Sequence, residues 1–592
     1  MNTRFLSFCA AGAICASASF AQGPFVAWQN SFAGAVGSSD WCKSIAVAPT
    51  GQAFVTGTTF EEESATSTVL VPRMLTRSIA PDGSTAWTRV FGLGFYSGNG
   101  VGTHVALQPT GRVVVGGAYD LGQDWVVVGY EANGALAWSG VWDANSWFSS
   151  EPADMAVDGA GNIYLCGDYG DPGLGMVGGV VKFGANGQLL WSRALDTTTE
   201  LNSVHGLCVD AAGSVYLTGL LFDGVGSDRF TVVKLDSSGT RVWTRSSGST
   251  ALGASSVGVD VGLDGNGRVL AAGYGSGPSS SSPDVLAVAY DASGNTLWNA
   301  SFDGGANQSE SVESLAIDAQ GRMFVAATTL VPPSDFDSLV VAFAADGSLA
   351  WSSHTPTPLD YEQPQTIATD GNGTALVAGL TISSTGWTGF ARLHFQGGAA
   401  LADFDFGPSD GRSFFQGSAA GPGRRWFVAG ELANANSDSN ALTVAIDDPT
   451  ATSYCTAGTS ALGCAALISA SGVPRASATS GFVLTTSGLD AQRLGLVFYG
   501  ISGRLAQAWG PTSSFLCVKP PTQRMPVQNS GGSVNTCSGT LTVDWSQFVA
   551  GSSALGTPFQ AGDIVHAQAW YRDPPSAKST ALSNALDFVV QP

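Results

Sequence analysis

Histidine is the side chain best suited to metal binding and proton transfer near neutral pH, and the chain holds five histidines. They are His104, His205, His354, His394 and His566. No two stand at a metal-ligand spacing such as H-x-x-x-H, so we predict no metal site among them. The chain contains a repeat of about 50 residues, described below, and His104 and His205 occupy similar positions in two of its copies. If the copies are arranged around a central channel, both histidines could face the same end of it. Both are candidate ligand-binding residues, although polar strand-end histidines without a function are the commoner case.

Acidic residues beside glycines are candidates for calcium, which prefers oxygen ligands. The candidates are the two DGNG stretches at 264–267 and 370–373, and the group Asp403, Asp405 and Asp410. Neither DGNG stretch continues into an EF-hand loop with its terminal glutamate. Asp and Asn beside glycine also stabilise hairpin turns without any ion. We therefore expect no cofactor, and calcium is the alternative.

Motifs of nucleophilic and nucleotide chemistry are missing from the chain. The sequence has no G-x-S-x-G elbow and no P-loop. One G-x-G-x-x-G string runs from Gly173 to Gly178, but it leads into an apolar strand pattern and not into a helix. The sequence therefore predicts no catalytic residues.

Tryptophans offer a different kind of site, because an exposed indole can stack on a glycan or anchor a partner. Seven of the sixteen recur at one fixed repeat position, which indicates packing. A functional tryptophan is expected outside that position, as are Trp125, Trp142, Trp147 and Trp387. Trp142 and Trp147, in VWDANSWF, are our candidates for an exposed recognition patch.

Cysteines divide by region, and the last part of the chain holds Cys455, Cys464, Cys517 and Cys537. In an exported chain, four such cysteines predict two disulfides. Sequence order favours Cys455–Cys464 and Cys517–Cys537, though three connectivities are possible. A metal site is the rival interpretation, but it lacks the C-x-x-C spacing it would need.

Three further cysteines lie among the repeats. Cys166 and Cys208 could pair across adjacent repeats or remain free buried thiols, since cysteine is often buried. Cys42 has no obvious partner.

The first residues resemble a secretory signal. Arg4 precedes an apolar run over residues 5–20, and Ser19-Phe20-Ala21 fits the small-x-small rule for cleavage after Ala21. A lipoprotein signal at Cys15 is a poorer fit, because the residues before it reverse the expected order. No later stretch reaches about 18 apolar residues, so we expect no membrane span. We predict a protein that is secreted or held at the cell surface.

The charge of the chain excludes some partners. Its 46 acidic residues exceed its 25 basic residues by 21. Such a chain repels nucleic-acid phosphates and anionic lipids. Its 44% hydrophobic content indicates a folded protein. The expected partner is a protein, a glycan or a small molecule, and we expect a monomer.

The elements that would position these residues belong to a repeat of about 50 residues, a period typical of β-propellers. Each copy has an alternating strand, a glycine turn, a second strand, a variable loop and an apolar third strand. A second glycine turn then leads to a tryptophan strand, as in DSSGTRVW (236–243). The first turn glycines are Gly51, Gly111, Gly161, Gly213, Gly267, Gly321, Gly373 and Gly423.

The repeat count predicts eight blades. The eighth block, about 412–447, lacks its outer strand, and we expect residues 24–32, with Trp28, to supply it and close the ring. Seven blades is the alternative, because the tryptophan phrase is degenerate around Phe404. After Tyr454 the repeats stop, and short alternating runs predict a small antiparallel β-sandwich. The predicted organisation is a signal peptide at 1–21, a propeller at 22–452 and a disulfide-linked sandwich at 453–592.

The D-x-x-G-x-x-x-W phrase resembles bacterial SBBP-type propeller repeats, and more distantly the repeats of quinoprotein (PQQ) propellers. The quinoprotein phrase carries one more residue between Asp and Gly, and the vicinal cysteine pair of those enzymes is absent here. The segment after Tyr454 resembles an uncharacterised C-terminal module of large exported bacterial proteins, with YCTAGTSALGC and QAWYRDP. That resemblance implies export and no activity.

Together these features favour an exported, non-enzymatic propeller that acts as a binding or scaffold module. The alternative is a propeller enzyme, either a degenerate quinoprotein-like oxidoreductase or a hydrolase or lyase with residues scattered over the blades. A binding scaffold should have a channel mouth without clustered, pKa-shifted groups, whereas an enzyme should gather such groups there.

Overall fold

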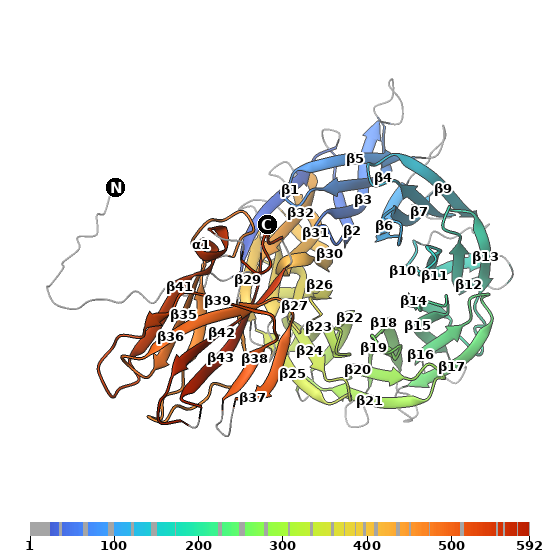
Figure 1. Cartoon of the computed structure of the whole chain (residues 1–592). Coiled ribbons are helices and arrows are strands. Elements are labelled where there is room, and N and C mark those ends of the chain that lie inside the picture. Colours follow the sequence, from blue (N-terminus) through green and yellow to red (C-terminus); the bar gives the residue numbers. More distant parts are fainter. Residues whose placement is uncertain are drawn as a thin grey trace. The chain divides into compact units, whose positions relative to one another are not determined.

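The computed structural model shows an all-β chain that divides into two compact units, one of residues 24–448 and one that includes 449–592 (Figure 1). It describes residues 24–590 apart from short internal stretches. These stretches are 35–37, 63–68, 93–99, 120–123, 144–150, 172, 174, 223–227, 248–254, 277–281, 306–307, 332–334, 357–359, 372, 385, 395–397, 399, 408–411, 434–437, 449–450, 473, 510–513, 552–553, 561–562 and 577.

Four-stranded antiparallel sheets, eight in number among the described residues, build the unit 24–448. We number them along the chain. Sheet 1 is β2–β5 (Trp41–Val47, Ala53–Glu62, Leu70–Ile79, Thr85–Phe91) and sheet 2 is β6–β9 (Gly100–Leu107, Val113–Tyr119, Asp124–Tyr130, Leu136–Asp143). Sheet 3 is β10–β13 (Asp154–Val157, Ile163–Asp171, Gly175–Phe183, Leu189–Ala194) and sheet 4 is β14–β17 (Ser203–Val209, Val215–Phe222, Asp228–Leu235, Arg241–Ser247).

The next three sheets repeat this order. Sheet 5 is β18–β21 (Ser256–Leu263, Val269–Ser276, Pro283–Tyr290, Thr296–Phe302) and sheet 6 is β22–β25 (Ser309–Ile317, Met323–Val331, Asp335–Phe343, Leu349–Thr355). Sheet 7 is β26–β29 (Tyr361–Thr369, Ala375–Ser383, Gly386–His394, Ala400–Phe406). The degenerate phrase around Phe404 therefore still forms an outer strand, β29.

Sheet 8 takes its outer strand from the other end of the unit. It contains β30 (Ser413–Ala420), β31 (Arg425–Ala433) and β32 (Ser439–Asp447), with a short 3-10 turn (Pro422–Arg424) between the first two. Its fourth strand is β1 (Phe25–Phe32), which pairs antiparallel with β32 from Phe25↔Asp447 to Phe32↔Ala441. The expected pairing of the first strand with the last repeat is therefore present.

A β-bulge recurs in the first strand of the sheets, and a glycine of the second strand lies opposite it. In sheet 7 the pairing shifts between Pro364 and Thr366, and Gly379 faces Pro364. A Cβ on Gly379 would lie 2.0 Å from the carbonyl oxygen of Gln363. This close approach gives a physical reason why a glycine stands at this position of the second strand.

The repeat tryptophans pack across the seams between sheets. The indole of Trp298 on sheet 5 donates to the carbonyl of Ala345 in sheet 6 at 3.1 Å and covers the turn at Gly347. Trp28 on β1 makes the same contacts with sheet 1, donating to Pro81 at 3.0 Å and covering Gly83. The fixed tryptophan position is thus a packing position, as the sequence indicated.

The unit that includes residues 449–592 has two main sheets around one core. The larger contains β33 (Thr452–Tyr454), β43 (Thr580–Val589), β42 (Ile564–Arg572), β36 (Leu494–Gly500), β39 (Thr522–Arg524) and β40 (Gln528–Asn529). The smaller contains β34 (Leu467–Ser471), β35 (Val483–Leu489) and β41 (Gly539–Asp544), followed by α1 (Trp545–Ala550). β37 (Arg504–Ala508) pairs with β38 (Phe515–Val518). Buried residues of both main sheets share one cluster with Trp545.

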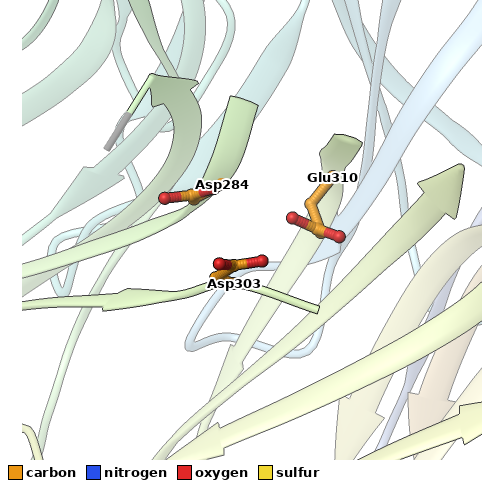
Figure 2. A group of neighbouring side chains, drawn as sticks. All are labelled: Asp284, Asp303 and Glu310. Atoms are coloured by element: carbon orange, nitrogen blue, oxygen red, sulfur yellow. The ribbon is translucent and has the colours of Figure 1, made fainter. Parts of the chain in front are cut away.

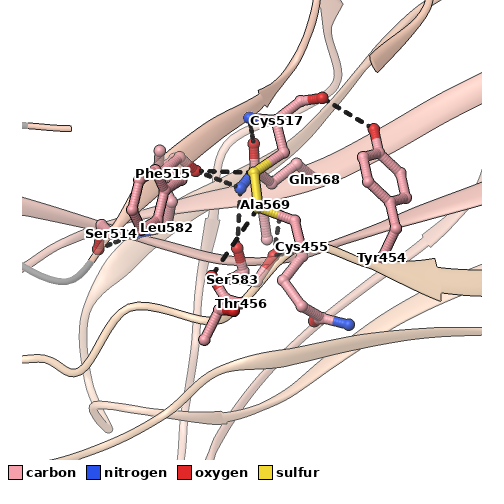
Figure 3. The surroundings of a disulfide bond; sticks show 11 residues. Tyr454, Cys455, Thr456, Ser514, Phe515, Cys517, Gln568, Ala569, Leu582 and Ser583 are labelled. Carbon is pink, nitrogen blue, oxygen red and sulfur yellow. Dashed lines mark hydrogen bonds between the residues drawn. A yellow bond between two sulfur atoms is a disulfide. The ribbon is translucent and has the colours of Figure 1, made fainter. Parts of the chain in front are cut away.

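The four cysteines of this unit form two disulfides, as expected, but the pairing favoured by sequence order is wrong. The bonds are Cys455–Cys517 and Cys464–Cys537. Around the first, Tyr454 donates to the Cys517 carbonyl at 2.9 Å (Figure 3). The pairing follows the sheets, because neighbours in space here are 62 and 73 residues apart in sequence. Cys42, Cys166 and Cys208 are free thiols, so the possible Cys166–Cys208 bond is absent.

Candidate functional site

The first strands of all eight sheets surround one central cavity of about 610 Å³. This volume lies in the range of small-molecule sites, roughly 300–1,000 Å³. We call the cavity the channel site. The bulges explain its polar lining, because a bulge re-aims a side chain that would otherwise follow the strand's alternation. The bulged residues that line it are Lys43, Thr103, His205, Val259, Glu313, Gln365 and Gln416.

Asp154 and Asp260 are the central acidic groups of the channel site, and each links its sheet to the next. Asp154 accepts the amides of Met155 at 2.7 Å and, in sheet 4, of Leu207 at 2.8 Å. Asp260 accepts those of Val261 at 2.7 Å and, in sheet 6, of Leu315 at 3.0 Å. Both carboxylates therefore hold the ring of first strands together as well as facing the cavity.

Burial sets the protonation of these two groups. Burial, together with the negative charge of Asp260, raises the pKa of Asp154 to about 7. Burial also raises the pKa of Asp260 to about 6. A carboxyl group that titrates near neutral pH can exchange a proton under physiological conditions.

We expect the Asp154 carboxyl to make stability depend on pH. Its folded pKa of about 7 exceeds the ordinary 3.8, so the folded state binds the proton more tightly between these values. The free energy of unfolding should therefore fall as the pH rises from 4 to 7. Asp154→Asn should flatten this fall by about 1–3 kcal/mol in urea titrations at several pH values. As a control, Asp82→Asn, at an exposed turn, should leave the pH dependence of the free energy of unfolding unchanged between pH 5 and 8. Equal pH dependence in the wild type and in Asp154→Asn would contradict the prediction.

The two candidate histidines both line the channel site. Burial, together with the positive charge of Lys43, lowers the pKa of His104 to about 4, so this ring is neutral at pH 7. Its Nε2 lies 4.0 Å from Oδ1 of Asp154. The Nδ1 atom of His205 bonds the carbonyl of Gly258 at 2.8 Å, which requires a proton on Nδ1. The Nε2 atom of His205 lies 2.9 Å from Oγ of Ser203.

Negative charge outweighs positive charge in the channel site. The lining carries four carboxyl groups and one lysine. The lysine, Lys43, is already paired with Glu151 at 2.6 Å. Burial raises the pKa of Glu313 as well. A cation that entered beside Asp154 and Asp260 would relieve the repulsion between like charges.

The expected tryptophan patch is not found at Trp142. Trp142 is buried, with its ring centroid 4.9 Å from that of Trp125 and 5.0 Å from that of Tyr169. It stands four residues after the packing tryptophan, Trp138, on the same strand, so strand alternation turns it to the same side, toward the next sheet. Trp147 lies outside the described residues.

Sequence reasoning missed Asp154, Asp260 and Glu313. A signal was available, because Asp154 precedes its turn glycine Gly161 by as many residues as His104 precedes Gly111. The same spacing places Asp260 before Gly267. Aligning the copies on the turn glycine would therefore have brought these residues into one ring with His104.

Three of the calcium candidates from the sequence, Asp264, Asp370 and Asp403, take part in other contacts. Asp264 accepts the amides of Asn266 and Arg268 at 2.9 Å and pairs with the Arg268 side chain. Asp403 pairs with Arg392 at 2.9 Å. Asp370 accepts the amide of Thr374 at 3.1 Å, which is a turn contact. Asp410 lies outside the described residues.

The repeated four-stranded sheets around a channel make this unit a β-propeller. No family model and no curated protein matches the chain. Among solved structures, the β-propeller domain of the Trilobed protease from Pyrococcus furiosus is 8% identical over 62% of this chain and 99% of that chain, with a TM-score of 0.36. The polysaccharide lyase Uly1 is 12% identical over 74% and 94%, with a TM-score of 0.37.

A third neighbour, Drosophila Plexin A in complex with Semaphorin 1b, is 8% identical over 72% of this chain and 88% of that chain, with a TM-score of 0.35. These similarities are too weak to carry an inference about activity. The likeness of the repeats to SBBP propellers, and of the last segment to an export-associated module, stays a prediction. No helix in the described part of the chain is long and apolar enough to cross a bilayer.

Proposed function

We propose that residues 24–448 form one eight-bladed propeller closed by β1. Contacts between first strands support this ring, since each contacts that of the following sheet and β30 of sheet 8 contacts β2 of sheet 1. The amide of Asp40 also donates to the carbonyl of Ser439 at 2.8 Å across the last seam. Sheet 7 is complete with β29, which favours eight blades over seven.

We further propose that the protein is exported and cleaved after Ala21. The two disulfides support this, because such bonds persist in oxidising, extracellular environments. The second unit then serves attachment or display, as its resemblance to a module of exported proteins implies. The proposal includes no organic cofactor and no nucleic-acid partner.

For the channel site we propose the reversible binding of a small organic cation with one or more amino groups. The observation that carries this is the excess of carboxylates in a cavity whose one lysine is already paired with Glu151. Ammonium groups are hydrogen-bond donors only, and they match carboxylate oxygens. His104 and His205 are then wall residues that orient the ligand.

Acid–base catalysis is the second candidate, and one observation favours it. A binding scaffold was expected to lack clustered, pKa-shifted groups at its channel and an enzyme to gather them, and the channel site holds such a cluster. Such a cluster is typical of catalytic sites. Binding remains the better proposal, because both Asp154 and Asp260 already accept two backbone amides and His205 is hydrogen-bonded through both ring nitrogens.

Calorimetric titration of the purified protein with linear diamines and polyamines tests the binding proposal. We expect binding that strengthens with pH, because ionised Asp154 attracts the cation. If binding requires that ionised form, the affinity should rise by up to about thirtyfold between pH 5.5 and 8. The other titratable groups facing Asp154 are His104, Asp260, Cys166 and Cys208, and the two thiols stay protonated in this range because burial raises their pKa.

Matched ligands and variants complete this test. Asp154→Asn should weaken amine binding roughly tenfold at pH 8, the effect of one lost charge pair worth about 1.4 kcal/mol. Asp82→Asn should not change it. Equal binding of neutral polyols, or amine binding that ignores both pH and Asp154→Asn, would refute the proposal. Turnover of an amine would favour the catalytic candidate instead.

A further inference from the structure

Three carboxylates outside the channel site converge at the seam between sheets 5 and 6. Asp284 lies near the start of β20, Asp303 directly follows β21, and Glu310 is the second residue of β22. Each offers an oxygen, and these oxygens all lie within 4.8 Å of one another. Figure 2 shows the three groups facing one another from separate strands. Two adjacent sheets therefore contribute to one acidic cluster.

Glu310 has a buried oxygen atom without a partner. The residue is 1% exposed, and its Oε1 accepts a hydrogen bond from Thr329 Oγ1 at 2.8 Å. Its Oε2 is buried and has no hydrogen-bond partner. An ionised oxygen left in this way is costly, so a ligand for it is expected. Both charged neighbours that act on Glu310, Asp284 and Asp303, are acidic, and with burial they raise the pKa of its carboxyl.

The next seam shows how the same arrangement is neutralised elsewhere. By strand register, Asp337 and Glu362 there correspond to Asp284 and Glu310. His354 lies 2.7 Å from Asp337, and Arg392 lies 3.3 Å from Glu362.

The Asp284–Glu310 seam lacks both of these basic side chains. The residues at the positions of His354 and Arg392 are Ser301 and Val341, which carry no charge. The seam adds a third carboxylate, Asp303, instead. The following seam has a histidine and an arginine beside its two carboxylates, whereas this one has three carboxylates, one of which carries the buried Oε2 without a hydrogen-bond partner.

We propose that Asp284, Asp303 and Glu310 bind one calcium ion that joins sheets 5 and 6. Calcium takes six to eight oxygen ligands at about 2.3–2.6 Å in a flexible geometry, which suits carboxylates that come from separate strands. Magnesium demands a near-ideal octahedron at about 2.0–2.1 Å and keeps several waters, so it is seldom held by a cluster of protein carboxylates alone. The Oε1 atom of Gln308 accepts a hydrogen bond from the same Thr329 hydroxyl at 3.2 Å, so a neutral amide oxygen also lies beside Glu310. Water completes the shell.

Titration of the full-length protein, stripped with EDTA and desalted, tests the site by calorimetry with calcium chloride. We expect one site with a dissociation constant on the order of 10⁻⁵–10⁻³ M, the range of moderate calcium sites. Glu310→Gln should weaken calcium binding at this site by roughly tenfold or more, since ligand charge sets affinity. Unchanged calcium binding in Glu310→Gln, or equal affinity for magnesium, would overturn the proposal.

Thermal melting separates a lost ligand from a damaged fold. In EDTA, Glu310→Gln should melt at or above the wild-type temperature, because it removes buried like charge. In 10 mM calcium the wild type should gain about 1–3 °C and the variant almost nothing. A variant that melts lower in EDTA and still gains with calcium would overturn the proposal.

Two control variants locate the ion. Glu362→Gln changes the equivalent carboxylate that Arg392 already neutralises, so it should melt lower in both buffers and keep calcium binding. Asp154→Asn changes the channel site and should also keep it. Loss of calcium binding in Asp154→Asn, with retention in Glu310→Gln, would place the ion in the channel and overturn the assignment.

Discussion

Deleting residues 24–32 should destabilise the propeller more than any single substitution on that strand. The deletion removes the pairing of β1 with β32, from Phe25↔Asp447 to Phe32↔Ala441, and with it the Trp28 indole that covers Gly83 of sheet 1. Truncating one large aromatic side chain costs about 3–5 kcal/mol. We therefore expect the free energy of unfolding of this unit to fall by at least that amount, measured by calorimetry or urea titration.

The deletion should also expose the edge of β32. An unpaired edge strand is a template for association, so the shortened protein should form oligomers in gel filtration. A synthetic peptide of residues 24–32, added in trans, should restore part of the lost stability. An unchanged melting temperature would show that β1 does not close the ring.

Two matched substitutions separate the seam contact from the strand itself. Trp28→Ala and Trp298→Ala remove indoles that make the same contacts, one between sheets 8 and 1 and one between sheets 5 and 6. If the seams are equivalent, both should cost about the same, and less than deletion of the strand. A negligible cost for Trp28→Ala alone would indicate that the last seam is loose.

Removing the disulfides should have the second largest effect and should be confined to the other unit. The bonds Cys455–Cys517 and Cys464–Cys537 link residues 62 and 73 positions apart. By loop-closure entropy, each stabilises by about 4 kcal/mol, within a usual range of about 2–5 kcal/mol. The double variant Cys464→Ser/Cys537→Ser should lower the free energy of unfolding of residues 449–592 by about 4 kcal/mol. Its melting temperature should fall accordingly.

The control for this prediction is the unfolding transition of residues 24–448, which contain no disulfide among the described residues. Reduction with dithiothreitol should leave the unfolding of residues 24–448 unchanged, because its three cysteines are free. Mass spectrometry of unreduced peptides should recover Cys455 with Cys517 and Cys464 with Cys537. Recovery of Cys455 with Cys464 would contradict the structure, and a reduced protein with an unchanged second transition would contradict the expected stabilisation.

The chain dictates the elements that rest on local chemistry. Glycine at the turns and alternating apolar strands indicate the hairpins, and the strand 25–32 is recognisable because its Trp28 repeats the outer-strand phrase. The four-stranded sheets that this repeat predicts are the ones observed, including sheet 7, whose tryptophan phrase is degenerate and which ends in β29. The candidate histidines also line the channel, because their offset from the turn glycine places them beside the bulge.

The candidate site itself was only partly predictable. His104 stood out because histidine is rare in this chain, whereas Asp154 and Asp260 were hidden among many acidic residues. Their offset from the turn glycine could have placed them in the channel, but their raised pKa depends on burial and charged neighbours, which the sequence does not report. Trp142 was misjudged for a related reason, since its exposure depended on Tyr169 of the neighbouring sheet.

The sequence by itself thus determined the repeat, the all-β class and the strand that completes sheet 8, because turns and strand alternation depend on residues close together in the chain. The tertiary structure alone decided the disulfide pairing, the ring of channel carboxylates and the cluster of Asp284, Asp303 and Glu310. These depend on which residues meet after the sheets assemble. Electrostatic repulsion and burial act through space, so their effects appear when distant segments come together.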